Sequence, residues 1–345
     1  MTLALKKVSS LRPPFKHLPI RAERLASEFD DEAENPMKTT ERPVAVIDIG
    51  SNTIKILVAA QALSTNGVHT LFESTIETRL SQGLNGNGRA LSGEIIEQGI
   101  QAVELLLKEA EAFSPAVVRI VATSALREAR NRDVFARRVR EATGHELRIL
   151  SGNEEARAIA RALALDPNLA AYRSYYVFDL GGGSLEGLVV RERSVESAMS
   201  LPLGAVRLME DRVADREAPF SATDRNGVET RVAQTLRESG FHFSMDAPVV
   251  ATGGALMVAR AILAVKAAIA AEDRSPVIRV EELESLLDEI GDLPLADRAA
   301  AIPELPARRA DIMPAALAIF IKLASLAGVD EIVVSRFNLR YGFID

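Results

Sequence analysis

Apolar residues along the chain fall into short β-branched runs and longer runs with helical spacing, and one combination of them occurs twice. The segment PVAVIDIGSNTIKILVAAQ (residues 43–61) places a glycine turn between two apolar runs, and YYVFDLGGGSLEGLVV (residues 175–190) does the same. Asp48 aligns with Asp179 and Gly50 with Gly181, so the unit recurs 131 residues later. This repeat predicts two equivalent lobes, each beginning with a β-hairpin.

The segments between and after the hairpins alternate strand and helix patterns. Residues 93–113 carry apolar residues at helical spacing, among them Ile96, Ile100 and Val103. Residues 117–130, 145–165 and 247–262 each have the pattern of a strand that runs into a helix. The alternation predicts an α/β fold in which ligands bind at the C-terminal ends of the strands.

Residues 1–42 differ in composition from the rest of the chain. They begin basic, turn acidic at EFDDEAEN, and contain four prolines without helix or strand periodicity. This pattern predicts a flexible N-terminal extension. We expect an N-terminal lobe at residues 43–157 and a C-terminal lobe at residues 158–345, with a cleft between the lobes.

Composition limits the kinds of ligand and site that the chain can have. The 345 residues carry a net charge of −7, so no overall positive field attracts nucleic acid or an anionic membrane. The lack of cysteine excludes disulfides, thiolate metal sites and a cysteine nucleophile, and four scattered histidines do not suggest a zinc cluster. No apolar run approaches the ~20 residues of a membrane span and no signal-peptide pattern is present, so we expect a cytoplasmic protein. A homodimer is the default assembly.

The two glycine turns suggest anion binding. Consecutive N–H groups in such a turn let a phosphate approach the backbone closely. Asp48 and Asp179 would repel phosphate unless a divalent cation lay between them, so two turns, two carboxylates and a cation form a consistent clamp. Either turn alone could be a tight hairpin, but their repetition favours binding. Neither turn has the spacing of a Walker A loop, and a strand follows each one where a dinucleotide fingerprint requires a helix.

Two adjacent glutamates differ in their predicted roles. Ser151 and Glu154 have the spacing of a helix-capping box, which explains Glu154 structurally. Glu155 lies on the inward helical stripe with Ile159, where a carboxylate is costly unless it is paired, metal-bound or used in catalysis. The residues alone leave a catalytic role and an ion pair with an arginine equally open.

Glu186 and Arg127 are further candidates. Strand alternation puts Ser184 and Glu186 on one face, so the carboxylate points toward the ligand of the glycine turn or into solvent. Arg127 lies at a strand-to-helix junction, where its guanidinium could bind a phosphoryl group or remain at the surface.

The motifs, in their order along the chain, resemble the exopolyphosphatase/guanosine pentaphosphate phosphohydrolase family, within the superfamily of acetate kinase, sugar kinases, Hsp70 and actin. They extend from about residue 43 to the end of the chain and include IDIGSNTIKILV, ATSALREARNRDVFARRV, ILSGNEEARA, FDLGGGSLE and RRADIMPAAL. The resemblance implies two ribonuclease H-like lobes. It also implies the short form of the family, without the C-terminal helical HD-like domain of longer members.

The resemblance implies roles for individual residues as well. Glu155 matches the general base that acts on the attacking water, and Arg127 matches an arginine near the reacting phosphate. Glu186 matches an acid that organises the site and, with Asp48 and Asp179, holds Mg²⁺, for which Mn²⁺ is an alternative. The implied phosphate-binding residues are Gly50, Ser51, Asn52, Gly181, Gly182, Gly183, Ser184 and Arg79.

The implied reaction is Mg²⁺-dependent hydrolysis of a terminal phosphoanhydride, in inorganic polyphosphate or at the 5′ end of guanosine pentaphosphate. A polyphosphate:ADP phosphotransferase and a non-catalytic polyphosphate or nucleotide sensor are alternatives. Two positions depart from the family pattern: Leu185 stands where threonine is usual, and RYGF replaces the usual R-E-G near the end. Leu185 should point away from the Ser184/Glu186 face, so we expect an adjustment of packing and no loss of catalysis.

Overall fold

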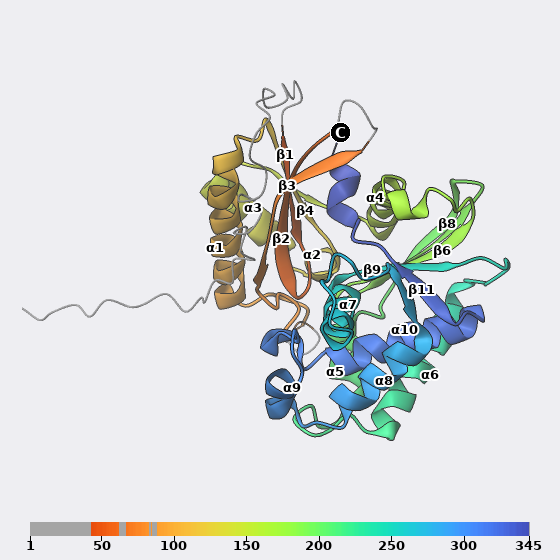
Figure 1. Cartoon of the computed structure of the whole chain (residues 1–345). Coiled ribbons are helices and arrows are strands. Elements are labelled where there is room, and N and C mark those ends of the chain that lie inside the picture. Colours follow the sequence, from red (N-terminus) through yellow and green to blue (C-terminus); the bar gives the residue numbers. More distant parts are fainter. Residues whose placement is uncertain (1–42, 62–66, 83, 85–87, 345) are drawn as a thin grey trace, which may run out of the picture. The chain divides into compact units, whose positions relative to one another are not determined.

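Two mixed β-sheets form the centre of the fold in the computed structural model (Figure 1), which describes residues 43–61, 67–82, 84 and 88–344. The first sheet has the strand order β3-β2-β1-β4-β5. Strands β1 to β3 form an antiparallel meander, whereas β4 and β5 run parallel to β1. The strands are β1 (Val44–Ile49), β2 (Thr53–Gln61), β3 (Val68–Glu77), β4 (Val117–Ala122) and β5 (Leu147–Ile149).

The second sheet repeats this plan. Its strands are β6 (Tyr175–Leu180), β7 (Leu185–Arg191), β8 (Ser194–Leu201), β9 (Val249–Thr252), β10 (Val277–Arg279) and β11 (Glu331–Val334). They follow the order β10-β11-β9-β6-β7-β8, in which β6 to β8 form the meander, β9 and β11 are the parallel strands and β10 is an added antiparallel edge. Both sheets therefore contain the strand order of a ribonuclease H-like fold, which confirms the predicted repeat and fold class.

The helices that follow the first meander cover one face of the first sheet (Figure 1). They are α1 (Gly93–Ala110), α2 (Ser124–Glu128) and α3 (Arg132–Thr143), with the 3-10 turn η1 (Glu111–Phe113) after α1. The side chain of Ser92 accepts the N–H of Ile95 and begins α1, which buries Ile96, Ile100 and Val103 as the spacing predicted.

The second sheet carries a larger helical layer. It comprises α5 (Ala205–Arg212), α6 (Ala222–Ser239), α7 (Gly254–Lys266), α8 (Val280–Gly291), α9 (Leu295–Ala301) and α10 (Met313–Ala327), with the 3-10 turn η3 (Ala307–Arg309). The 3-10 turn η2 (Pro167–Leu169) lies apart from this layer, because its Leu169 belongs to another hydrophobic core. Helix α10 packs against α6 and α8 and is buried along most of its length, so it is the centre of this layer. Leu185 is fully buried in the same hydrophobic core, whereas Leu188, on the strand face of Glu186, belongs to another core, so Leu185 points away from that face as predicted.

Helix α4 (Gly152–Leu163) and the last 3-10 helix, η4 (Leu339–Phe343), share a hydrophobic core with strands of both sheets. The predicted lobe boundary between residues 157 and 158 falls inside α4, which continues without a break, and the boundary stays a prediction. The predicted extension at residues 1–42 lies outside the described residues.

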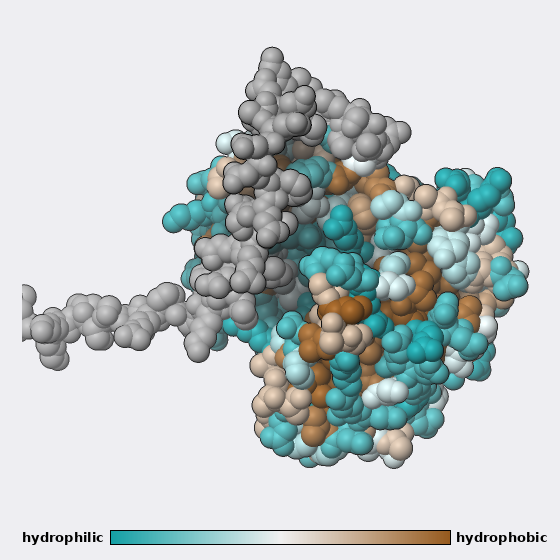
Figure 2. Space-filling view, in the orientation of Figure 1, coloured by the Kyte–Doolittle hydropathy of each residue, from teal (hydrophilic) through white to brown (hydrophobic). Residues whose placement is uncertain are grey.

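Polar side chains cover much of the described surface on the face drawn in Figure 2, with apolar patches between them. Among the residues that the structure describes, no helix is both long and apolar enough to cross a membrane.

Candidate active site

The two glycine turns have the same backbone geometry. The N–H of Gly50 donates to the carbonyl of Thr53 at 3.0 Å, and the N–H of Gly181 donates to the carbonyl of Ser184 at 3.0 Å. Each turn joins the first two strands of its meander, so Asp48 and Asp179 occupy the equivalent positions that the sequence assigned to them.

The turns lie against each other. A Cβ atom on Gly183 would lie 2.5 Å from Oγ of Ser51 and 2.7 Å from Oγ of Ser124, so only glycine allows this approach. The void beside this contact has a volume of about 10 Å³, which is space for about one water molecule and too little for a phosphate group. The structure is therefore a closed form, and a phosphate chain can enter between the turns only if they separate.

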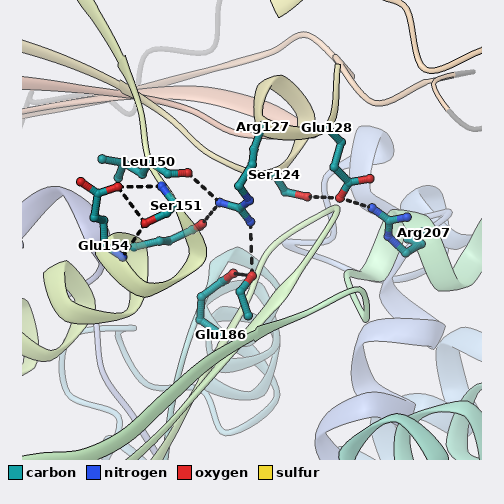
Figure 3. Close-up of polar contacts among 10 residues, drawn as sticks. Ser124, Arg127, Glu128, Leu150, Ser151, Glu154, Glu186 and Arg207 are labelled. Carbon is teal, nitrogen blue, oxygen red and sulfur yellow. Dashed lines mark hydrogen bonds and ion pairs between the residues drawn. The ribbon is translucent and has the colours of Figure 1, made fainter. Parts of the chain in front are cut away.

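Ion pairs between elements of the two sheets hold this closed form. Arg207 on α5 contacts Oε1 of Glu128 at 2.6 Å and donates to the carbonyl of Gly183 at 2.8 Å. Ser124 donates to the same glutamate oxygen at 3.1 Å (Figure 3). A more open pocket of about 360 Å³ lies next to Arg127, with Ser184 and residues of α4 in its lining.

Arg79 is also part of this closure. Its guanidinium donates to both carboxylate oxygens of Asp311, at 2.9 and 3.2 Å, and to the carbonyl of Arg308 at 2.9 Å. Glu77 supplies a further contact at 2.8 Å. The predicted phosphate contact of Arg79 stays a prediction, and in this form a phosphate would have to replace Asp311.

The two neighbouring glutamates of α4 separate as their spacing predicted. Glu154 forms the capping box with Ser151 and pairs with Arg148 at 2.5 Å, on the exposed side of the helix. Glu155 is 6% exposed, and its Oε2 accepts from Nη1 of Arg127 at 2.7 Å. Burial raises the pKa of Glu155 well above its usual value, and the charge of Glu186 raises it further. A base with a raised pKa holds a proton more strongly once it has taken one.

Arg127 is the centre of a polar network that links α4 to the second sheet (Figure 3). Besides Glu155, its guanidinium contacts the carbonyl of Leu150 at 3.1 Å and Oγ of Ser200 at 3.2 Å. Ser200 in turn donates to Oε1 of Glu186 at 2.7 Å. One arginine and one serine therefore connect the two glutamates that the sequence had marked separately.

Glu186 lies on β7 opposite Asp179 and is almost fully buried. Burial raises the pKa of its carboxyl to about 7, and the charge of Asp179 adds to the rise, while hydrogen bonds from Ser200 and Ser184 oppose it. Glu186 thus points into the protein, toward the turn, and not into solvent.

Ser200 should control the charge of Glu186. Its replacement by alanine removes a hydrogen bond that favours the carboxylate, so the pKa of Glu186 should rise. We expect kcat to fall and the acidic limb of the pH–kcat profile to move up by about one pH unit. Ser197→Ala, at an exposed position of the same strand, is the control. An unshifted limb in Ser200→Ala would show that Glu186 does not govern it.

The charge of one half-buried lysine acts on both aspartates. Lys55 stands opposite Asp48 in the β1–β2 register, and its charge also acts on Asp179. Burial lowers the pKa of Lys55 to about 8, and the positive charges of Arg309 and Arg340 lower it further. The lysine offsets part of the acid charge in the closed form.

Burial also shifts the pKa values of the two aspartates. Burial raises the pKa of Asp48, against the charges of Lys55 and Arg340. Burial likewise raises the pKa of Asp179 to about 6, with Lys55 opposing and Asp48 adding to the rise. Both carboxylates therefore bind a proton or a cation more readily than an ordinary aspartate does.

The fit of a magnesium ion can be judged from these donors. Among the described residues, no group of three or more histidine, cysteine, aspartate or glutamate side chains lies close enough to hold a metal, so Asp48, Asp179 and Glu186 do not form a closed cage. However, Oδ1 of Asp48, Oγ of Ser51 and Nδ2 of Asn52 are buried without a hydrogen-bond partner in the described part of the chain. Mg²⁺ is usually held by one or two carboxylates together with water and substrate phosphate. Asp48 and Ser51 fit that mode.

Sequence patterns did not single out two residues of the site, Lys55 and Ser200. Lys55 appeared only as part of a strand-like run, because its position opposite Asp48 depends on the register of the hairpin. Ser200 stands directly before LPLGAVRLME (residues 201–210), another of the motifs that resemble the family, and that adjacency was the available signal.

Comparison with known proteins agrees with this architecture. Residues 57–345 match the Ppx/GppA phosphatase family, and the chain belongs to this family. An Aquifex aeolicus PPX-GPPA enzyme is 25% identical, with a TM-score of 0.69 over 88% of this chain and 98% of that one. An exopolyphosphatase from Cytophaga hutchinsonii is 19% identical, with a TM-score of 0.78 over 87% of this chain and 96% of that one, and shows the same fold.

Proposed function

We propose that this member of the phosphatase family is a Mg²⁺-dependent phosphoanhydride hydrolase. Its substrate is inorganic polyphosphate, from which it releases terminal orthophosphate, or guanosine pentaphosphate, from which it removes the 5′-terminal phosphate. The observation that carries the proposal is the buried Glu155–Arg127 pair together with two glycine turns, the first of which has unsatisfied polar atoms at Asp48, Ser51 and Asn52. The names of the Aquifex and Cytophaga proteins support the same substrate class.

The site supports in-line hydrolysis. Glu155 takes a proton from water, the water oxygen attacks the terminal phosphorus, and the bond from that phosphorus to the bridging oxygen breaks. Orthophosphate leaves together with a chain that is one phosphate shorter. Arg127 offsets charge on the transferred phosphoryl group, and the backbone N–H groups of the two turns hold the terminal phosphates.

The closed form suggests how substrate prepares the base. Glu155 and Arg127 neutralise each other at 2.7 Å without substrate. A phosphoryl group next to Arg127 competes with Glu155 for the guanidinium, which frees the carboxylate to accept a proton from the attacking water. Asp48 and Ser51 would hold Mg²⁺, which supplies charge neutralisation for the phosphate oxygens.

Removal of the metal tests whether turnover depends on it. We expect EDTA to lower the rate of phosphate release at least about a hundredfold, because a catalytic metal contributes several kcal/mol of charge stabilisation. Added Mg²⁺ should restore the rate, and Mn²⁺ should restore part of it. Undiminished turnover in EDTA would contradict metal dependence.

A parallel assay tests the substrate and the alternatives. Phosphate release is measured with polyphosphate, guanosine pentaphosphate and ATP, each with and without ADP. Formation of ATP from polyphosphate and ADP would indicate phosphotransfer, and binding without phosphate release would indicate a sensor.

A further inference from the structure

The end of the chain returns from the second sheet to the first. After β11, the chain runs to η4, which lies beside α4 (Figure 1). The most extensive contacts of η4 are with α4, and it also touches β1 and β2. Its apolar side chains belong to the hydrophobic core that contains α4 and strands of both sheets.

The contact with α4 depends on a glycine. A Cβ on Gly342 would lie 2.0 Å from the carbonyl oxygen of Ala158 and 2.6 Å from its carbonyl carbon. These are backbone atoms, so no side chain can move aside to make room. Arg161, one turn further along α4, donates to the carbonyl of Gly342 at 3.0 Å. The backbones of the two segments are therefore in direct contact.

The other side of η4 is tied to the first sheet. Arg340 donates to the carbonyl of Ile56 on β2 at 2.6 Å and to Glu73 on β3 at 2.9 Å. The hydroxyl of Tyr341 lies 2.9 Å from that of Thr70. The segment thus connects three elements, β2, β3 and α4, by directional hydrogen bonds.

We propose that the C-terminal segment Leu339–Phe343 is a positioning element for Glu155, and that Gly342 and Arg340 are its positioning residues. Glu155 lies in the first turn of α4, and Ala158, which Gly342 touches, is three residues later on the same helix. A displacement of α4 by about 1 Å moves the carboxylate away from attacking water, and such displacements lower rates about 10²-fold. This inference rests on the proposed role of Glu155 as base.

Gly342→Ala is the direct test. We expect kcat for phosphate release to fall about 10²-fold, with KM within about twofold of the wild type, because the phosphate-binding turns are untouched. Amide hydrogen exchange should speed up in α4 and stay unchanged in α6. A loss of packing that only lowered the amount of folded protein would scale all rates together and leave kcat per folded molecule unchanged.

Arg340→Lys is the second variant, and it decides the matter where Gly342→Ala fails to fold. Lysine keeps the positive charge that acts on Asp48 but cannot contact Ile56 and Glu73 as a fork. We expect a roughly tenfold lower kcat with little change in KM, and no effect from Arg336→Lys at an exposed position shortly before the segment.

The outcomes separate the two claims. Near-native kcat in folded Gly342→Ala or Arg340→Lys, or a raised KM with unchanged kcat, overturns the positioning role alone. A wild-type protein that releases no phosphate from polyphosphate or guanosine pentaphosphate overturns the proposed function, and the inference falls with it.

Discussion

Glu155→Gln should lower kcat for phosphate release by ~10²–10⁴-fold, the usual contribution of a general base. Glutamine has nearly the same shape and can accept the hydrogen bond from Arg127, so the fold and the phosphate-binding turns should be retained. The variant should therefore still bind polyphosphate. Phosphate release under saturating substrate measures the rate, and equilibrium binding of polyphosphate measures the affinity.

The adjacent glutamate provides a matched control. Glu154→Gln makes the same chemical change one residue earlier, at a capping position where the side chain is 41% exposed. Because glutamine also completes a capping box, we expect near-native kcat in that variant. Comparable activity in Glu155→Gln and Glu154→Gln would remove Glu155 from the mechanism, and an equal loss in both would point to damage at the start of α4.

Local features of the chain predicted much of the fold. The repeated hairpins predicted the first two strands of each meander. The capping box predicted different roles for Glu154 and Glu155. These signals come from residues within a few positions of one another, where backbone geometry follows directly from side-chain type. The ribonuclease H-like class rested on the ordered motifs and agrees with the observed strand order.

Contacts between distant segments could not be predicted in the same way. The Ser200–Arg127 hydrogen bond joins residues 73 positions apart, and the Arg340–Ile56 contact joins residues 284 apart. The closed approach of Gly183 to Ser51 depends on how the sheets pack, which hairpin spacing does not contain. For this reason the sequence predicted the two turns but not the direct contact between them in this structure.

Glu186→Gln should inactivate the protein and also stabilise it at alkaline pH. Burial and the charge of Asp179 raise the pKa of Glu186 from 4.5 to about 7 in the folded protein. Between these values the folded state holds a proton that the unfolded chain releases, so the free energy of unfolding decreases as pH rises through this window. Glutamine cannot ionise and avoids that decrease. At pH 8 we expect the variant to be more stable by roughly 1–3 kcal/mol.

The stability difference between Glu186→Gln and the wild type should depend on pH. At pH 5 the folded wild type already carries a neutral Glu186, so the difference in Tm between variant and wild type should shrink to near zero. Thermal unfolding is measured in metal-free buffer at both pH values, with Glu104→Gln on the exposed face of α1 as the control for loss of one charge. We expect kcat with Mg²⁺ to fall about a hundredfold, because Ser200 loses its charged acceptor and Arg127 loses the nearby negative charge of Glu186. A stability gain of equal size at pH 5 and pH 8, or a loss at pH 8, would show that the ionised form of Glu186 does not destabilise the folded protein.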